Sequence, residues 1–202
     1  MQTEKWRPVV GFEGYYEVSD WGSTIIEDSR NKPGHHGHIE AWMRDHGVSF
    51  LPHDRALPFG DYMRDGSNVS VDTKKDVQEL AMDCGRDHAR FVRECERARD
   101  AGYRLYVLVE QHPEYNDRRR LEGWVSGVCR RCHHRMRGTC KGPSTQAGRR
   151  CPRGMRPMHG DTLAKILTTM ELRYDVRFRF CRKQDAARII CELLGEEVDD
   201  GR

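Results

Sequence analysis

Apolar residues along this chain recur with two different periods, one typical of β-strands and one typical of α-helices. Short apolar runs and two-residue alternation predict strands at residues 24–26, 48–51, 68–73, 105–109 and 176–180. Apolar residues spaced three or four positions apart predict helices at residues 39–46, 76–82, 86–101, 161–170 and 186–194. Because strands and helices alternate, the pattern predicts an α/β fold in which helices flank a mixed central β-sheet.

The composition fits one polar globular domain. Of the 202 residues, 37% are hydrophobic and 33% are charged, and a chain of this length can bury a real core. No stretch approaches the roughly 20 apolar residues that cross a bilayer. The first eight residues contain no apolar signal core. We therefore expect a cytoplasmic protein without a membrane partner.

Three aspartates stand at or near the ends of predicted strands. Asp61 and Asp72 are expected on adjacent antiparallel strands, and Asp28 follows the first strand. The two carboxylates of Asp61 and Asp72, with the Thr73 carbonyl, could converge on one Mg²⁺, which prefers oxygen ligands. Lys74 lies two residues after Asp72 and so on the same face, where it could stabilise charge developing on a phosphate. The triplet D-x-K alone occurs by chance in many charged proteins; the combination is typical of metal-assisted phosphodiester hydrolysis.

Four stretches in this order resemble the XPF-type nuclease domain of the PD-(D/E)XK superfamily. They read IIEDSR, LPFGDYM, VSVDTKKDVQEL and RFVRECERARDAGYRLYVLVE. The residues that match the three acidic motifs of that family are Asp28 with Arg30, Gly60 with Asp61, and Asp72 with Lys74. Asp72 stands where the family has glutamate, and Gln78 stands where it has a further acid. The stretches GDTLAKILTTM and VRFRFC look like the end of phage-type members.

The resemblance covers residues 23–194 and leaves residues 195–202 as a tail. It implies a restriction-endonuclease-like core and a metal-dependent endonuclease acting on flapped, forked or branched DNA. It implies that Asp28, Asp61 and Asp72 bind Mg²⁺ or Mn²⁺ and that Lys74 and Arg30 take part in catalysis. Relatives of this type are usually targeted by a paired subunit, so a homodimer or a protein partner is expected.

Several other acids and histidines lie near these motifs. Alternation along the strand puts Glu27 and Asp28 on opposite faces, and we expect Asp28 in the site because Arg30 shares its side. Glu110 is interpreted as a strand-end residue rather than a ligand. The histidines at positions 35, 36 and 38 follow a Pro-Gly break, and we expect them in a solvated loop near the site.

Residues 118–156 form a strongly basic segment. It contains twelve arginine and lysine residues and a single acid, Glu122, whereas the whole chain has a net charge of only +3. So long a basic run repels itself unless a polyanion neutralises it, and this favours DNA as a partner over a simple solvated loop. The expected DNA contacts are Arg130, Arg131, Arg135, Arg137, Arg149 and Arg150.

Four of the eight cysteines fall inside the basic segment. Cys129 and Cys132 form a C-x-x-C knuckle, and Cys140 and Cys151 could complete a four-thiolate structural Zn²⁺ site. Alternative ligands are His133, His134 and His159. The other interpretation is a reduced loop without metal. Residues 118–156 are therefore expected to be a cysteine-rich insertion in the nuclease fold.

The N-terminal residues 1–22 carry a separate motif. The stretch WRPVVGFEGYYEVSDWG resembles the short modular DNA-binding motif found beside HNH homing endonucleases. The matching residues are Trp6, Pro8, Gly14, Tyr15, Tyr16, Val18, Ser19 and Gly22. The basic residues that usually follow are missing, so an accessory hairpin that covers a sheet edge is an equal alternative.

Two other functions remain open at this stage. One is a non-catalytic, zinc-dependent nucleic-acid-binding protein derived from a nuclease, which would rely on the basic segment. The intact acids and Lys74 argue against it. The other is a nuclease that acts mainly on RNA.

Overall fold

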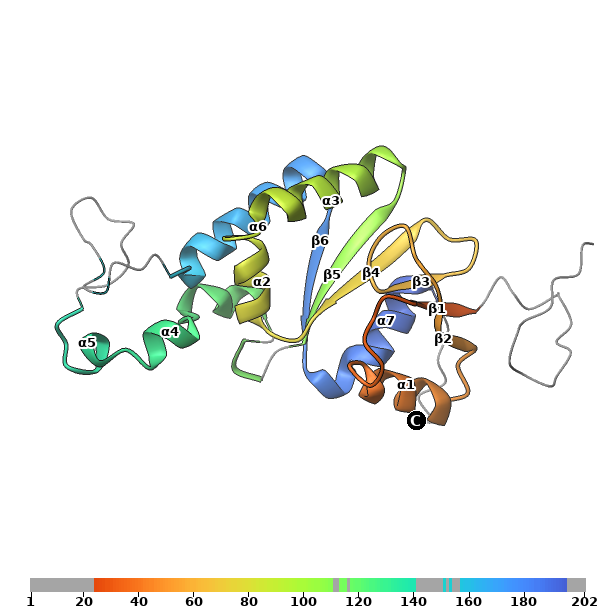
Figure 1. Cartoon of the computed structure of the whole chain (residues 1–202), viewed down its shortest axis with the longest axis horizontal. Coiled ribbons are helices and arrows are strands. Elements are labelled where there is room, and N and C mark those ends of the chain that lie inside the picture. Colours follow the sequence, from red (N-terminus) through yellow and green to blue (C-terminus); the bar gives the residue numbers. More distant parts are fainter. Residues whose placement is uncertain are drawn as a thin grey trace, which may run out of the picture.

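A six-stranded mixed β-sheet forms the centre of the protein (Figure 1). The computed structural model describes residues 24–110, 113–115, 117–140, 151, 153 and 157–195. The strands are β1 (Ile25–Asp28), β2 (Phe50–Arg55), β3 (Tyr62–Arg64), β4 (Val69–Lys74), β5 (Arg104–Glu110) and β6 (Arg177–Cys181). Their spatial order is β2-β1-β3-β4-β5-β6. The expected α/β class and the mixed sheet are confirmed.

The strand directions follow from the lengths of the connections. β3 and β4 are joined by a short turn and pair antiparallel, and β3 also pairs antiparallel with β1. β4, β5 and β6 are parallel, and long helical crossovers connect them, as parallel strands require. β1 and β2 are also parallel, with the helix α1 (Gly37–Asp45) between them in sequence. The strand expected at Asp61, antiparallel to that of Asp72, corresponds to β3, which has three residues and begins one residue after Asp61.

Helices cover both faces of the sheet (Figure 1). One face carries α2 (Val77–Asp83), α3 (His88–Asp100) and α6 (Gly160–Tyr174), and the other carries α1 and α7 (Ala186–Leu194). Successive side chains of strand β5 point alternately to the two faces of the sheet and pack in both cores. Val107 and Val109 pack in the α2–α3–α6 core, whereas Leu108 packs in the α1–α7 core. This two-sided burial explains the continuous apolar run in β5.

The basic segment does not begin as an insertion. The 3₁₀ helix η3 (Arg118–Gly123) and the following Trp124 pack into the core under α6, and Leu121 is fully buried. At Gly160, a Cβ atom would lie 1.9 Å from the Leu121 carbonyl oxygen, so only glycine allows this approach. These first residues of the basic segment are therefore part of the core. The sequence concealed this because three arginines precede Leu121 and dominate the local pattern.

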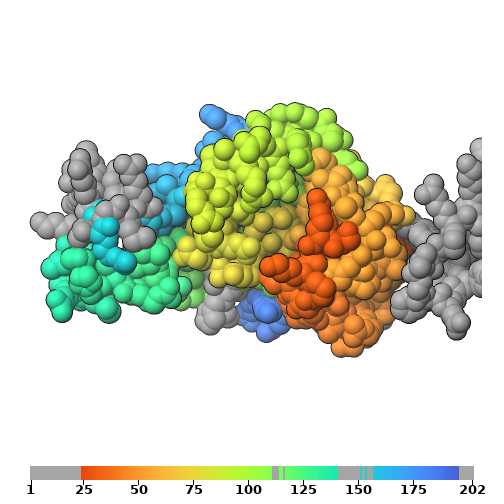
Figure 2. Space-filling model, viewed as in Figure 1, coloured from red at the N-terminus to blue at the C-terminus, as the bar shows by residue number. Residues whose placement is uncertain are grey.

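The remaining short elements lie at one end of the molecule or between larger ones. The short helices α4 (Gly127–Arg130) and α5 (His133–Met136) lie beyond the N-terminal end of α6 (Figures 1 and 2). The other 3₁₀ helices are η2 (Pro113–Tyr115) and η4 (Lys183–Asp185). The N-terminal motif at residues 1–22 and most of the tail lie outside the described residues. Within the described ranges, no helix has the length and apolar character needed to span a membrane.

Candidate active site

The turn before β3 places Asp61 against β4. Gly60 has a φ of 64°, and a Cβ atom there would lie 2.8 Å from the Val71 carbonyl oxygen. A larger residue would push the turn away from β4. The Asp61 carboxylate accepts hydrogen bonds from the backbone N–H of Thr73 at 2.8 Å and from its hydroxyl at 2.6 Å. The glycine that precedes Asp61 therefore has a direct role in positioning it.

Asp72 and Lys74 lie together on the α2–α3 face of β4. Their side chains form an ion pair in which Lys74 Nζ is 2.7 Å from Asp72 Oδ2. The same Nζ is 3.1 Å from Asp83 Oδ2 and 5.9 Å from the centre of the Phe91 ring. Burial lowers the pKa of the Lys74 ammonium, but the carboxylates of Asp72 and Asp83 raise it above the ordinary value. Lys74 is thus a fixed positive charge.

The negative charges around Asp72 favour a bound cation. The pKa of the Asp72 carboxyl is raised, mainly by burial. Lys74 lowers this pKa, and the neighbouring Asp61 charge raises it. Glu94 on α3 adds a further repulsive charge. Asp72, with the Asp61 carboxylate near enough to raise its pKa and the Thr73 carbonyl next to it in sequence, offers oxygen donors of the kind that Mg²⁺ and Mn²⁺ prefer. These residues fit a divalent ion.

The backbones of Asp28 and Asp61 are hydrogen-bonded to each other, but the Asp28 carboxylate contacts other residues. The Asp28 N–H donates to the Asp61 carbonyl at 2.8 Å. Its carboxylate accepts from Arg30 Nε at 2.9 Å and from the Leu57 N–H at 3.2 Å. Burial raises the pKa of Asp28, but these hydrogen bonds and the Arg30 charge lower it overall. Arg30 is itself 65% exposed, so Asp28 holds a guanidinium that solvent can reach.

The three sequence-predicted aspartates do not form one three-carboxylate cluster. Among the described residues, the group of His, Cys, Asp and Glu side chains whose ligand atoms all lie within 4.8 Å of one another is Glu27, Glu40 and His53. The expected alternation of Glu27 and Asp28 is nevertheless observed. Glu27 accepts from residues on the α1–α7 side, whereas Asp28 and Arg30 share the other side.

Two of the three histidines expected in a solvated loop make side-chain contacts with residues of the sheet. His36 is buried, with Nδ1 3.0 Å from Glu27 Oε1 and Nε2 3.2 Å from the Thr73 hydroxyl. Burial lowers the pKa of His36, but Glu27 raises it overall, with Asp61 and Glu110 adding to the rise. His38 pairs with Glu110 at 2.8 Å. The loop interpretation was wrong for these two, because His36 contacts Glu27 on β1 and Thr73 on β4, and His38 contacts Glu110 at the end of β5.

Sequence reasoning also missed contacts made by the helices beside β4. Asp83, at the end of α2, bridges Lys74 and the Arg90 guanidinium, the latter at 2.8 Å. Glu94 lies one turn after Arg90 on α3 and pairs with it at 3.6 Å. No motif marks Asp83 or Glu94. Their place near Lys74 could be inferred only from the packing of α2 and α3 on β4.

The basic segment presents exposed arginines on α4, α5 and the residues that follow them. The exposed residues are Arg130, Arg131, Arg135 and Arg137; Arg149 and Arg150 lie outside the described residues. Of the four cysteines, Cys132 is buried and the other three are partly exposed. Backbone N–H groups of Arg135 and His134 lower the pKa of the Cys132 thiol. Within the described ranges, no metal-ligand group of three includes these cysteines.

Comparisons with known proteins bear on the family and the fold of the chain. The family model described as the ERCC4 domain matches residues 28–193. Among solved structures, the chain is similar to XPF from Aeropyrum pernix, with 18% sequence identity and a TM-score of 0.51. The alignment covers 85% of this chain and 60% of the XPF chain. At this identity the likeness establishes the shared restriction-endonuclease-like fold. The search of curated proteins finds no match.

Proposed function

This chain belongs to the ERCC4 domain family, and from that premise we propose that it is a metal-dependent endonuclease that hydrolyses phosphodiester bonds in DNA. The proposed substrates are flaps, forks or branches. The observation that carries the proposal is the grouping of Asp61, in the turn before β3, with Asp72 and Lys74 on the adjacent strand β4. Asp61 is held by Thr73, and Asp72 pairs with Lys74 at 2.7 Å.

Each of these residues has a distinct role in the proposed reaction. Asp61, Asp72 and the Thr73 carbonyl would hold Mg²⁺ or Mn²⁺. When bound, the ion supplies positive charge to the reacting phosphate and makes a water molecule more acidic. Lys74 contributes a second, permanent positive charge where the phosphate gains negative charge. Asp28 orients Arg30, whose Nε and Nη2 donate to Asp28 and the Leu57 carbonyl, so that the exposed guanidinium can donate to a phosphate oxygen through Nη1.

The rival function is nucleic-acid binding without catalysis. A protein that had lost catalysis would be free to lose the carboxylates that burial makes costly. Here burial and Asp61 keep the pKa of Asp72 raised although Lys74 pairs with it, and such perturbed carboxyls are typical of functional sites. Activity mainly on RNA is a second alternative, and the cleavage assay separates it.

The deciding experiment is a cleavage panel. Labelled single-stranded, duplex, flap, fork and four-way-junction DNA, with a matched RNA duplex, are incubated with Mg²⁺, Mn²⁺ or EDTA. We expect cleavage of a branched DNA with either metal and none with EDTA. Cleavage of RNA alone would show that RNA is the substrate. Binding without cleavage under every condition would favour the rival function.

The exposed arginines of the basic segment are expected to supply DNA affinity. Replacing Arg130, Arg131, Arg135 and Arg137 together with alanine should raise the Kd and flatten its salt dependence, because each phosphate contact contributes about 0.9 log unit per log unit of salt. The thermal melt should stay close to that of the parent, since all four side chains are exposed. Titrations at several salt concentrations measure the slope.

A matched variant tests whether position or net charge matters. Arg44, Arg104, Arg179 and Arg182 are four exposed arginines on the α/β body. Replacing these four with alanine removes the same charge and should change the salt slope less. Equal effects of the two variants would show that overall charge drives binding, and an unchanged slope in the first would make the segment a docking site for another protein.

We further propose that Cys129, Cys132, Cys140 and Cys151 bind one structural Zn²⁺. The lowered pKa of Cys132 supports this, because the thiolate is the form that binds metal. Elemental analysis of protein purified without added metal should show a Zn²⁺ that Cys132→Ser loses. Cys84→Ala is the control, since burial raises the pKa of Cys84 to about 12 and keeps it a thiol. Full retention of zinc in Cys132→Ser would remove the proposal.

A further inference from the structure

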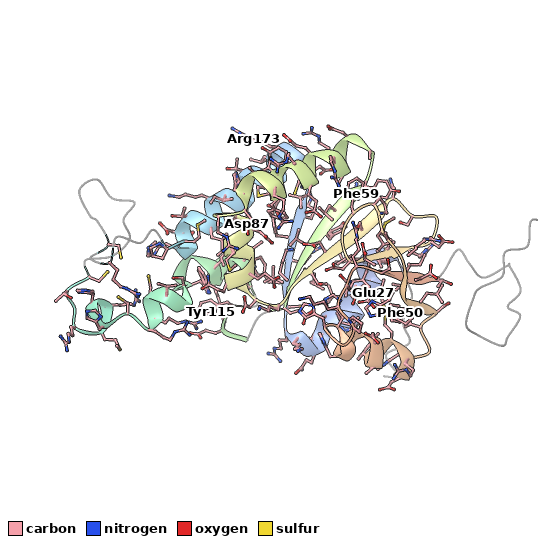
Figure 3. The ribbon with its side chains drawn as sticks, in the orientation of Figure 1. Glu27, Phe50, Phe59, Asp87, Tyr115 and Arg173 are labelled. Carbon is pink, nitrogen blue, oxygen red and sulfur yellow. The ribbon has the colours of Figure 1, made fainter. Side chains whose placement is uncertain are left out.

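Glu27, Glu40 and His53 meet on the side of the sheet away from Asp72 and Lys74. They come from three elements, β1, α1 and β2, and their ligand atoms all lie within 4.8 Å of one another. Figure 3 shows Glu27 near Phe50, in the part of the molecule that α1 and α7 cover. None of the three belongs to an acidic motif that suggested the nuclease.

The two oxygen atoms of the Glu27 carboxylate have different surroundings. Glu27 is fully buried, and its Oε1 atom contacts His36, Asn31 and the Tyr62 hydroxyl. Its Oε2 atom has no hydrogen-bond partner among the described residues. That oxygen points toward His53, whose Nε2 is 3.8 Å away, too far for a hydrogen bond. A buried carboxylate oxygen left without a donor costs free energy that a cation would offset.

The backbone around His53 supports its position in the group. β1 and β2 pair in register at Ile26 and Leu51, and the next pair is Asp28 with Arg55. Glu27 therefore faces an irregular stretch of β2 that contains His53. His53 itself has a φ of 51°, the left-handed region that non-glycine residues seldom adopt. This irregularity brings the imidazole close to Glu27.

We propose that Glu27, Glu40 and His53 form a second metal site, which binds a divalent transition-metal ion such as Zn²⁺. An imidazole with two carboxylates suits Zn²⁺ better than Mg²⁺, which favours oxygen ligands alone. In a tetrahedral zinc site, bonds of about 2.1 Å put ligand atoms about 3.4 Å apart. The Glu27–His53 separation of 3.8 Å is near that value. A water molecule would be the fourth ligand.

This site would be linked to the proposed active site by hydrogen bonds. Glu27 Oε1 contacts His36 Nδ1 at 3.0 Å, and His36 Nε2 contacts the Thr73 hydroxyl at 3.2 Å. The Thr73 hydroxyl donates to Asp61 at 2.6 Å. An ion on Glu27 would therefore hold one end of a chain whose other end orients Asp61. Its role is to position residues, since none of its three ligands touches Asp72 or Lys74 in a described contact.

Equilibrium dialysis of the full chain with Zn²⁺ tests the proposal without any DNA. His53→Ala and Glu40→Gln should each bind one Zn²⁺ fewer per chain than the wild type, whether or not the cysteines hold another. A large excess of Mg²⁺ should not displace this ion. Zn²⁺ should raise the Tm of the wild type more than that of His53→Ala, because binding stabilises the folded state.

Two matched variants control for indirect effects. His88→Ala removes an exposed histidine from α3, and Asp45→Asn removes an exposed acid from α1. Both should keep the wild-type stoichiometry. Co²⁺ gives a second readout, because an oxygen and nitrogen site lacks the near-ultraviolet charge-transfer band of thiolate ligands. Unchanged stoichiometry in His53→Ala and Glu40→Gln, displacement by Mg²⁺, or equal loss in the control variants would each overturn the proposal.

Discussion

Replacing Asp61 or Asp72 with asparagine is expected to abolish measurable DNA cleavage while leaving DNA affinity within a few-fold. Both carboxylates are proposed ligands of the ion that stabilises the reacting phosphate. That stabilisation is several kcal/mol, and each 1.36 kcal/mol corresponds to tenfold in rate, so cleavage should fall by about three orders of magnitude or more. DNA affinity is expected to persist because it rests on the exposed arginines of α4 and α5. Single-turnover cleavage and salt titrations measure the two quantities separately.

Both variants should remain folded. In Asp61→Asn, the amide oxygen of the new side chain can still accept the two hydrogen bonds that Thr73 donates at 2.8 and 2.6 Å. At Asp72, burial already raises the pKa and disfavours the charge that asparagine lacks. Asp100→Asn is the matched control, because Asp100 is exposed at the end of α3 and pairs with Arg99. Parallel loss of binding and cleavage, or unchanged cleavage, would contradict the assignment of these acids.

Replacing Lys74 with alanine should lower the turnover by about two to four orders of magnitude, the usual scale for losing a positioned charge in the transition state. The effect is expected in kcat more than in KM, because Lys74 lies among Asp72, Asp83 and the Phe91 ring and not on the exposed binding surface. Removing the ammonium also leaves the carboxylates of Asp72 and Asp83 without the positive charge that both contact. Binding of Mg²⁺ by the variant should therefore be measured alongside its turnover.

Lys75→Ala is the control for Lys74→Ala. Lys75 is the next residue and is exposed, and it contacts Glu79 through its backbone N–H. Removing its side chain takes away the same charge without touching the Asp72–Lys74 pair. Lys75→Ala should keep near-normal turnover. If Lys74→Ala did as well, Lys74 would have no catalytic role.

The local pattern of the sequence was sufficient for the architecture and for the main residues of the candidate site. Strands β4 and β5 were visible because period-two alternation and continuous apolar runs are local signals. Asp72 and Lys74 could be placed on one face of β4 for the same reason, and the pair is observed at 2.7 Å. Gly60 and Asp61 were recognised because they match a motif of the family that the chain resembles, and the structure shows that the turn against β4 needs this glycine.

Tertiary structure alone decided which partner each charged group has. Alternation separates Glu27 from Asp28 but does not say that Glu27 meets His36 and that Asp28 meets Arg30 and Leu57. The same holds for Asp83, which reaches Lys74 only because α2 packs beside β4. Apart from Asp28 with Arg30, these contacts join residues on different elements, so no local period encodes them.

In the basic segment, the sequence showed the charge but not which residues are buried. Its charge was evident from composition, but Leu121 and Trp124 within it are core residues because α6 packs over them and Gly160 permits close approach. Charge is a property of the residues themselves and can be counted along the chain. Burial depends on which distant element covers a residue, and for this segment that element is a helix much later in the chain, at Gly160–Tyr174.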